Sequence, residues 1–273
     1  ANQLLYRTGV DYQFSKKTVS GTEIFSKILP KIDFSNDSMK IKDGEFVKGI
    51  IDKTAFGVEE GELVKVIDRE KGRNEAFESI QRAFNLGKNF LTDQGISLSV
   101  NDFDLAESTL KMTDEVVEKA EKKTEEIIQE YRNRTLEIIP GKTLEQSREI
   151  KMLRVLNEVR TKIGEIVKRE FPKDNPVAHM INSGGGGNIL NITQMACCVG
   201  QQDLQGKRVD IGYSNRTLSS FKRGDLSPRS RGFIRTPYIK GLKPDEFFFG
   251  AMTGRATLMD TALRTPKSGY LYR

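Results

Sequence analysis

The chain closes with KGLKPDEFFFGAMTGRATLMDTALRTPKSGYLYR, residues 240–273, a stretch that predicts one long helix. Asp245 follows Pro244 and offers a carboxylate to the unpaired amides of the first turn. Apolar side chains recur on more than one side of this helix, at Phe247, Phe248, Met252, Leu258 and Leu263. Charged groups that would be costly in a dry core lie among them, at Arg255, Asp260, Arg264 and Lys267. The mixture predicts a helix that crosses a wet, charged cavity; a core helix with snorkelling ends is the alternative.

Pro266 lies inside this predicted helix, four residues after Ala262. Proline has no N–H to give to the carbonyl of Ala262, and its ring crowds that carbonyl. We therefore expect a distorted turn from Ala262 to Pro266. The alternative is that Pro266 marks the end of the helix, which Ser268 and Gly269 would also allow.

The length and charge of the chain limit its class. Its 273 residues suffice for one large or two ordinary domains. The net charge of +6 is concentrated near the end, because residues 200–273 carry 14 Lys and Arg against 6 Asp and Glu, and residues 1–199 carry 30 against 32. Such a local positive field suits a polyanion such as nucleic acid or nucleotide phosphates; a solvated basic surface is the alternative.

The cysteines and apolar runs exclude several classes. The only two cysteines, Cys197 and Cys198, are adjacent, which indicates neither a disulfide framework nor a structural zinc site. A reducing, intracellular setting fits best. No apolar run approaches the roughly 18 residues of a membrane helix, and no signal-peptide pattern is present. The chain starts at Ala1 without a Met, so we expect it to be part of a longer protein.

The first 92 residues predict short, mixed elements. Residues 21–29 have helical spacing and stop at Pro30, and residues 39–51 alternate around Asp43–Gly44 as a hairpin does. Two helical segments follow, at residues 61–70 and 74–92.

Residues 105–171 predict two long amphipathic helices. The first has apolar residues at three- and four-residue steps, at Val117, Ala120, Ile127, Ile128 and Tyr131. The second has them at Leu153, Leu156, Val159, Ile163, Ile166 and Val167. Residues 139–142 break the pattern, and Thr143 with Gln146 forms a capping box that starts the second helix. A helical hairpin packed along one seam is expected; a coiled-coil spacer is the alternative.

Six blocks of sequence follow one another in an order that carries a resemblance. They are Pro140–Glu145, Leu156–Arg160, Asn188–Ala196, Val199–Arg208, Arg216–Leu218 and Arg231–Ile234. In this order they resemble the funnel of archaeal and eukaryotic RNA polymerase largest subunits, residues 240–273 resemble the bridge helix of the same family, and the first part resembles its pore region. The form RTLSSFKRGDL at residues 216–226 with RGFI at 231–234 looks closer to archaeal versions, with a nuclear or viral relative second.

The resemblance implies an α+β fold with a small mixed pore region (1–93), a funnel with a helical hairpin (94–240) and a long bridge helix (241–273). It implies that the segment lines the channel through which nucleotides enter a DNA-directed RNA polymerase and supports template positioning. Partners would be the other subunits, template DNA with the DNA–RNA hybrid, and nucleoside triphosphates, with no membrane. Mg²⁺ would be bound outside this segment, which alone should be inactive. The setting would be the cytoplasm at the nucleoid if archaeal, or the nucleus if eukaryotic.

The resemblance also assigns site residues. Those expected to line the active centre are Arg255, Asp260, Thr261, Arg264, Thr265, Pro266, Lys267 and Tyr270. Thr265 and Pro266 would lie beside the templating position, with Arg264 and Lys267 toward nucleic-acid phosphates. A polar funnel network behind the helix would comprise Asn157, Arg160, Gln194, Gln201, Gln202, Lys207 and Arg208.

Some positions depart from the family pattern. Gly186 replaces a basic residue in the Gly184–Gly187 loop, which weakens any expectation of direct triphosphate contact. Ala256 replaces a carboxylate, and Pro266 replaces a small residue. Asp102 and Asp104 resemble part of the family's magnesium loop but lack its spacing and third carboxylate, so we interpret them as helix-start residues. His179, the only histidine, is expected to be structural.

A hypothesis from another class is a non-catalytic helical adaptor that binds nucleic acid through its basic end. A helical hairpin with a basic tail would suffice for that. The ordered set of Asn157, Arg160, Gln201, Gln202 and residues 260–270 favours the polymerase interpretation, because an adaptor has no reason to carry it.

Overall fold

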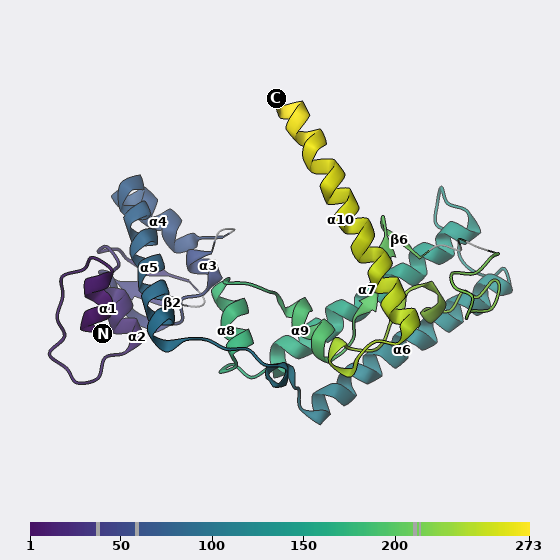
Figure 1. The fold of residues 1–273 in the computed structure, drawn as a ribbon, viewed down its shortest axis with the longest axis horizontal. Helices are drawn as coiled ribbons and strands as arrows, with labels where there is room; N and C mark the ends of the chain where they lie inside the picture. Colours follow the sequence, from purple (N-terminus) through teal and green to yellow (C-terminus); the bar gives the residue numbers. More distant parts are fainter. Residues whose placement is uncertain (37–38, 58–59, 210–211, 213) are drawn as a thin grey trace. The chain divides into compact units, whose positions relative to one another are not determined.

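The computed structural model describes residues 1–36, 39–57, 60–209, 212 and 214–273. Helices are combined with small antiparallel sheets, which confirms the predicted α+β class (Figure 1). The chain divides into two compact units, residues 1–102 with 173–187 and residues 103–172 with 188–273. Each unit has a hydrophobic cluster of its own. The functional division at residues 93 and 240 stays a prediction.

The first unit surrounds a three-stranded antiparallel sheet in the order β1-β2-β3. Its strands are β1 (Phe34–Ser35), β2 (Met39–Lys42) and β3 (Glu45–Gly49). Its helices are α1 (Asn2–Arg7), α2 (Gly21–Ser26), α3 (Lys53–Phe56), α4 (Glu62–Lys71), α5 (Arg73–Gln94) and α8 (Pro176–Ser183). The core of the unit gathers Ile32, Met39, Ile41, Ala55, Leu63, Ile67 and Ala76.

The hairpin predicted around Asp43–Gly44 is confirmed. Both turn residues adopt positive φ, 48° at Asp43 and 76° at Gly44, as a tight hairpin turn with a primed geometry requires. A Cβ at Gly44 would lie 2.8 Å from the carbonyl oxygen of Pro30. Glycine is therefore required here both by its backbone conformation and by the close approach of Pro30.

The helix predicted over residues 21–29 is shorter than expected. Ser20 and Glu23 form a capping box at its start, but α2 ends at Ser26. Beyond that point the amides of Lys27 and Ile28 bond to carbonyls three residues back. These are bonds of the 3-10 type, and Pro30 prevents the α-helix from continuing further. The helices predicted at 61–70 and 74–92 are confirmed as α4 and α5.

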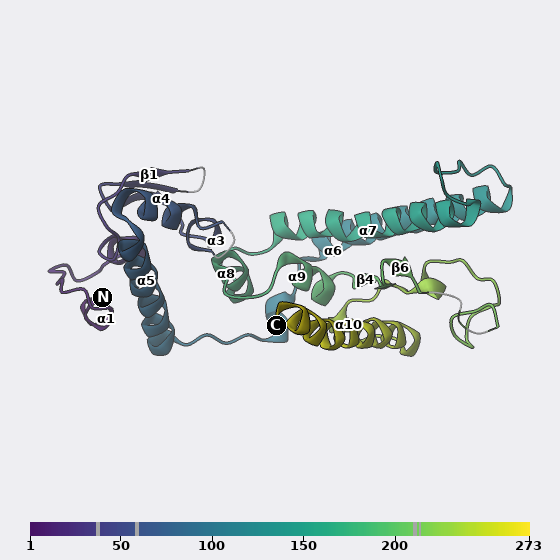
Figure 2. The same ribbon diagram turned by 90° about the horizontal axis from the view of Figure 1, so that it is seen from above.

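The second unit is built on the predicted helical hairpin, which is confirmed. Figures 1 and 2 show α6 (Glu107–Arg132) and α7 (Leu144–Glu170) side by side. The capping box of Thr143 and Gln146 is present at the start of α7. The buried side of α6 has smaller and more polar side chains than predicted, because three threonines are buried beside Val117, Ala120 and Ile128. These are Thr109, Thr113 and Thr124.

The rest of the second unit consists of short elements. They are α9 (Ile189–Ala196), β4 (Gly200–Gln201), β5 (Asp203–Leu204), β6 (Lys207–Arg208), η2 (Arg229–Arg231), β7 (Phe233–Ile234) and η3 (Tyr238–Lys240). Of these, α9, β4 and β6 contact α7. Antiparallel pairs form between β4 and β7 and between β5 and β6. Val199, Val209, Ile234 and Phe249 form a cluster that holds the first turns of α10 (Pro244–Tyr272).

The long C-terminal helix predicted from residue 240 is confirmed as α10, with one correction at its start. The carboxylate of Asp245 does not cap the helix, because it accepts hydrogen bonds from Arg229 at 3.0 and 2.9 Å. Glu246 takes the capping role, accepting from the amide of Lys243 at 3.0 Å. Within the described part of the chain, no helix is both long and apolar enough to span a bilayer.

Replacing Gly44 by Ala should destabilise the first unit. The new Cβ meets the Pro30 carbonyl in a backbone conformation that disfavours side chains, so we expect a loss of roughly 1–2 kcal/mol in the free energy of unfolding. Urea denaturation measures this loss. Gly21→Ala is the matched control, since its φ is not positive and its Cβ meets no described atom within 4 Å. Equal stability of the two variants would contradict the prediction.

Candidate functional site

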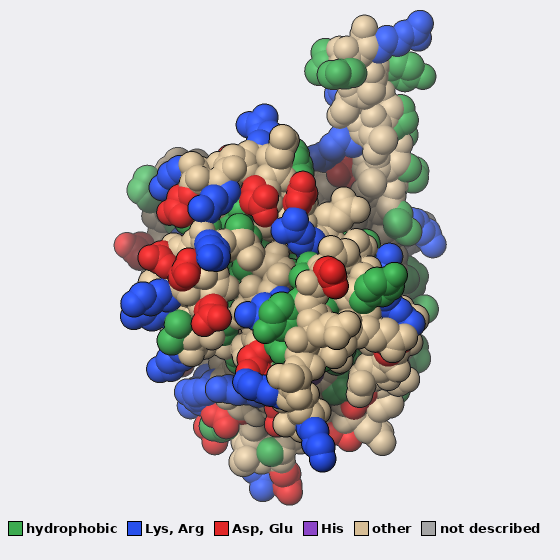
Figure 3. Space-filling model, turned by 90° about the vertical axis from the view of Figure 1, so that its left-hand side faces the viewer, with side chains coloured by type: hydrophobic (Ala, Val, Ile, Leu, Met, Phe, Trp, Pro, Cys, Tyr) green, Lys and Arg blue, Asp and Glu red, His purple; other side chains and the backbone are tan. Residues whose placement is uncertain are grey.

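The C-terminal part of α10 exposes every side chain from Gly254 to Tyr272. All eight residues expected to line the active centre lie on it. Figure 3 shows this part of the helix as a projecting column with hydrophobic and basic side chains on several sides. Leu258, Met259 and Leu263 are between 63% and 74% exposed. A helix that presents both apolar and cationic groups has the surface of an element that other molecules surround.

Arg264 is held only weakly within the chain. Its guanidinium donates to Asp260 four residues earlier, at 2.9 Å, and both side chains are largely exposed. Exposed pairs of this kind contribute little to stability. The Arg264 guanidinium can therefore exchange Asp260 for a phosphate at small cost. Asp260, Thr261, Arg264, Thr265 and Ser268 line a shallow hollow on this surface.

A ladder of threonine hydroxyls follows one side of the same helix. Thr257, Thr261 and Thr265 each donate to the carbonyl four residues earlier, at 3.0, 3.0 and 2.9 Å. Hydroxyl bonds of this type compete with the backbone ladder and favour bending. The last of them lies directly before Pro266.

The helix continues through Pro266 to Tyr272. The alternative that Pro266 marks the helix end is therefore wrong. The carbonyl of Ala262 has no amide from Pro266 to accept. The expected bend at this turn stays a prediction.

A buried ion cluster lies behind the base of α10, centred on Glu149 of α7. The side chain of Arg208 is fully buried and donates to both carboxylate oxygens, from Nε at 2.9 Å and from Nη2 at 3.0 Å. Arg148 donates to the same carboxylate at 2.8 Å, and Arg231 lies 3.8 Å from it. Burial alone would raise the pKa of Glu149, but the hydrogen bonds and charge of Arg208, with Arg148 and Arg231, lower it to about 2.

Gln201 and Gln202 join this cluster to the β4–β7 pair. Gln201 is buried, and its Nε2 donates to the carbonyls of Gln202 at 2.7 Å and Arg231 at 2.9 Å. The amide of Gln202 donates to the carbonyl of Gly232 at 2.8 Å. The Gln201 side chain thus ties β4 to the segment that carries Arg231.

Arg160 contributes through its stem. A Cβ at Gly200 would lie 2.8 Å from both Cγ and Cδ of Arg160, so the arginine lies directly across the start of β4. Gln194 reaches the carbonyl of Val199 at 3.5 Å. The structure therefore brings together Arg160, Gln194, Gln201, Gln202 and Arg208. Asn157 and Lys207 are exposed and make no side-chain hydrogen bond to another residue of the described ranges, so they stand apart from this cluster.

Two interacting groups of this unit are not predictable from local sequence patterns alone. Glu149 had no signal, because Arg208 follows it by 59 residues. Arg235 lies against three carboxylates of α6: Glu121 at 3.0 Å, Glu118 at 3.6 Å and Asp114 at 3.7 Å. These carboxylates recur at three- and four-residue steps, and that acidic stripe was the available signal.

The other positions considered from the sequence lie outside the Glu149 cluster. Asp102 lies in the first turn of the 3-10 helix η1 (Val100–Phe103), where its carboxylate accepts from the Ser99 amide at 2.6 Å, so the expectation of a helix-start residue is confirmed for Asp102. Asp104 lies between η1 and α6, which starts at Glu107, so the expectation is wrong for Asp104. Asn188, after the glycine loop, caps α9 by accepting from the Asn191 amide. His179 is exposed on α8. Burial raises the pKa of Cys197 to about 11 and that of Cys198 to about 12, so both remain thiols.

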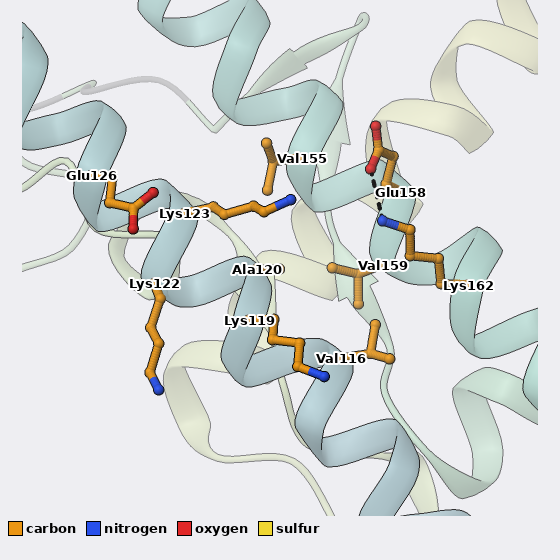
Figure 4. Close-up of a pocket in the computed structure, with 10 residues that line it drawn as sticks. All are labelled: Val116, Lys119, Ala120, Lys122, Lys123, Glu126, Val155, Glu158, Val159 and Lys162. Atoms are coloured by element: carbon orange, nitrogen blue, oxygen red, sulfur yellow. Dashed lines mark hydrogen bonds and ion pairs between the residues drawn. The ribbon is translucent and has the colours of Figure 1, made fainter.

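A groove of about 350 Å³ crosses the helical hairpin (Figure 4). Val116, Ala120, Val155 and Val159 form its apolar part. Lysines 119, 122, 123 and 162 border it with Glu126 and Glu158, and Lys162 is paired with Glu158 at 3.0 Å. Among the residues that line it, none is a Ser, Thr, Cys or His, and its two acids, Glu126 and Glu158, are not buried. Across the described ranges, no group of three or more His, Cys, Asp or Glu side chains is placed to hold a metal ion.

Comparison with known sequences gives three consecutive family matches. They are RNA polymerase Rpb1, domain 3 at residues 3–103, domain 4 at residues 127–234 and domain 5 at residues 241–273.

Similar curated proteins are DNA-directed RNA polymerase subunits Rpo1N of archaea. That of Methanocaldococcus jannaschii is 42% identical over 93% of this chain and 20% of its own length. That of Halococcus morrhuae is 41% identical over 88% of this chain and 68% of its own, and that of Thermococcus celer 42% over 85% and 26%. The chain thus spans about a fifth of the Methanocaldococcus protein and about a quarter of the Thermococcus protein.

Replacing Glu149 by Gln should destabilise the second unit strongly. The change leaves the buried Arg208 without its counter-charge, which costs about 3–5 kcal/mol. Urea denaturation measures the change in unfolding free energy. Glu158→Gln, which removes the exposed partner of Lys162, is the matched control and should cost less than about 1 kcal/mol.

The same variant should alter the response to acid. Because the pKa of Glu149 is lowered in the folded chain, its contribution is fully present above its ordinary pKa of 4.5 and is lost as the pH falls toward 2. The stability difference between the wild-type chain and Glu149→Gln should therefore shrink over that window. A difference that stays constant from pH 5 to pH 2 would contradict the assignment.

Proposed function

Because the chain belongs to the family of archaeal-type largest subunits of DNA-directed RNA polymerase, we propose that it lines the channel through which nucleotides enter that enzyme and supports template positioning. The observation that carries this proposal is α10, which is anchored in the second unit at Phe249 and exposes every side chain beyond Thr253. Such a helix is suited to cross a cleft between other parts of an assembly.

The exposed surface of α10 has cationic and apolar parts, which suit contacts with nucleic acid and with protein respectively. The cations Arg255, Arg264 and Lys267 suit nucleic-acid phosphates, because each is exposed and only Arg264 has a carboxylate partner among the described residues. Pro266 interrupts the regular backbone ladder and would lie with Thr265 beside the templating position. The exposed leucines and Met259 would pack against protein.

The buried cluster behind the helix serves as support for it. The Arg208 guanidinium binds Glu149, and the Gln201 Nε2 donates to backbone carbonyls, so both side chains are buried and would position α10. Of the predicted funnel residues, Asn157 and Lys207 remain the exposed ones that could face the channel.

The nucleotidyl transfer itself would be carried by carboxylates outside this segment. Mg²⁺ held there would stabilise the triphosphate and activate the attacking hydroxyl. Asp102 and Asp104 do not fit such a site, because the Asp102 carboxylate is engaged by the Ser99 amide. We therefore propose that the chain alone is inactive, and nucleotide incorporation by the purified chain would overturn this. In an archaeal cell the assembled enzyme would work in the cytoplasm, at the nucleoid.

The salt dependence of nucleic-acid binding tests the role of Arg264. In the assembled polymerase, Arg264→Ala should weaken binding and reduce the slope of log affinity against log salt by about 0.9 for each phosphate that the enzyme no longer neutralises. A fluorescence titration of labelled template duplex at several salt concentrations measures the slope. Arg169→Ala is the matched control, because Arg169 on α7 is also exposed and paired, with Glu170 at 2.7 Å. An unchanged slope for Arg264→Ala would assign Arg264 to a structural pair.

The elongation rate tests the role of Pro266. Pro266→Ala supplies an amide for the Ala262 carbonyl and removes the ring crowding, which favours a straight helix by up to about 3 kcal/mol. The rate of RNA elongation by the assembled enzyme on a defined template should change at least severalfold. Ser268→Ala is the control in the same turn. A rate equal to that of the wild type, or a bend at Pro266 below roughly 20°, would leave the kink without a role.

A further inference from the structure

One side of α5 carries an exposed apolar stripe. Its members are Phe77, Ile80, Phe84 and Leu91, which are 64%, 41%, 67% and 50% exposed. They are spaced three, four and seven residues apart, which places them in one line along the helix. The buried residues of α5, Ala76 and Ser79, lie on a different side of the helix, where Ala76 belongs to the core cluster that includes Leu63 and Ile67 of α4. The stripe is therefore separate from the core of the first unit.

Gly87 completes the repeat of this stripe. Residues 77, 80, 84, 87 and 91 alternate three- and four-residue steps, which is the repeat of a helix that packs on another helix. A glycine inside a helix is unfavourable relative to alanine. A Cβ at Gly87 would meet no described atom within 4 Å, so packing among the described residues does not explain it. A glycine in the middle of an apolar seam permits a second helix backbone to come close.

The charges beside the stripe are of one sign. Arg73 and Lys88 border it, both are exposed, and neither has an ion-pair partner among the described residues. The carboxylates of α5 are turned to other sides and engaged: Glu75 and Glu78 bind Arg82, and Asp93 binds Arg7. A partner helix that packs on the stripe would therefore need carboxylates at the edges of its own apolar seam, where they would pair with Arg73 and Lys88.

We propose that the Phe77–Leu91 face of α5 is a docking surface for an amphipathic helix of another polypeptide of the assembled polymerase, crossing closest at Gly87 and flanked by Asp or Glu side chains. This assignment goes beyond the role of α10 in the channel and depends only on membership of the polymerase family.

A photo-crosslinking amino acid at position 84 of the subunit, within the purified assembled polymerase, tests the identity of the partner. Peptide sequencing of the crosslink should give a segment of another subunit with apolar residues at three- and four-residue steps and acidic residues beside them. The same reagent at Tyr6, an exposed aromatic of α1, is the control and should give no such peptide. Crosslinks from position 84 to nucleic acid, to a non-helical or basic segment, or only within the subunit would overturn the proposal.

A substitution at Gly87 gives a second test, because it should raise the stability of the free subunit and lower its affinity for the partner. Gly87→Leu should raise the unfolding temperature of the free subunit, because the helix gains a better helix former in open space. It should lower the affinity of that subunit for its partner at least tenfold, because the side chain blocks the close approach. Phe84→Glu should lower the affinity similarly, and Tyr6→Glu should leave it within twofold. A Gly87→Leu subunit that assembles as well as the wild type would overturn the proposal. The variants should assemble poorly, but the polymerase that does form should add nucleotides at the normal rate. This outcome would distinguish the docking surface from the proposed role in the channel.

Discussion

The buried pairing of Arg208 with Glu149 is the interaction on which the second unit depends. A fully buried guanidinium is tolerable only when a carboxylate faces it in good geometry, and here both carboxylate oxygens accept from it. Through this pair α7 fixes β6, and through Arg231 it fixes the turn before β7. Gln201 then links that turn to β4, and the paired strands place Val199 and Ile234 around Phe249. The buried ion pair therefore fixes the position of the first turns of α10 indirectly, through the strands that hold Phe249.

This arrangement makes α10 a helix supported at one end. Asp245 is held by Arg229, Glu246 by Thr236 and Lys243, and Phe249 by the apolar cluster, all within its first two turns. An isolated helix of the remaining length is marginal in water, and threonines and a proline lower its stability further. The free part of α10 therefore belongs to the least stable parts of the chain and takes its final form from what surrounds it.

The sequence predicted the elements whose signals are local and could not predict those that depend on distant pairing. The Thr143–Gln146 box, the Asp43–Gly44 turn and the length of α10 each follow from residues within a few positions. The strands β4 to β7 have two residues each, too few for any alternation to show. The Glu149 cluster combines residues from α7, β6 and η2. In the sequence, Glu149 cannot be distinguished from the other carboxylates of a highly charged helix. The pairing of Asp245 with Arg229 is unpredictable for the same reason, since only the fold brings the two side chains together.

The distribution of helix-weakening residues along α10 suggests where it can deform. Gly254 lies at the point where the helix leaves the second unit, and Pro266 lies twelve residues beyond it. Between them, the threonine hydroxyls at 257, 261 and 265 add bonds to carbonyls that the backbone already uses, whereas the carbonyl of Ala262 receives neither a hydroxyl bond nor an amide from Pro266. The stretch from 254 to 266 is therefore bounded by two weak points, and the threonine hydroxyl bonds between them favour bending. The turn at Ala262–Pro266 lacks a backbone hydrogen bond and follows these threonines, so we expect α10 to deform there most easily.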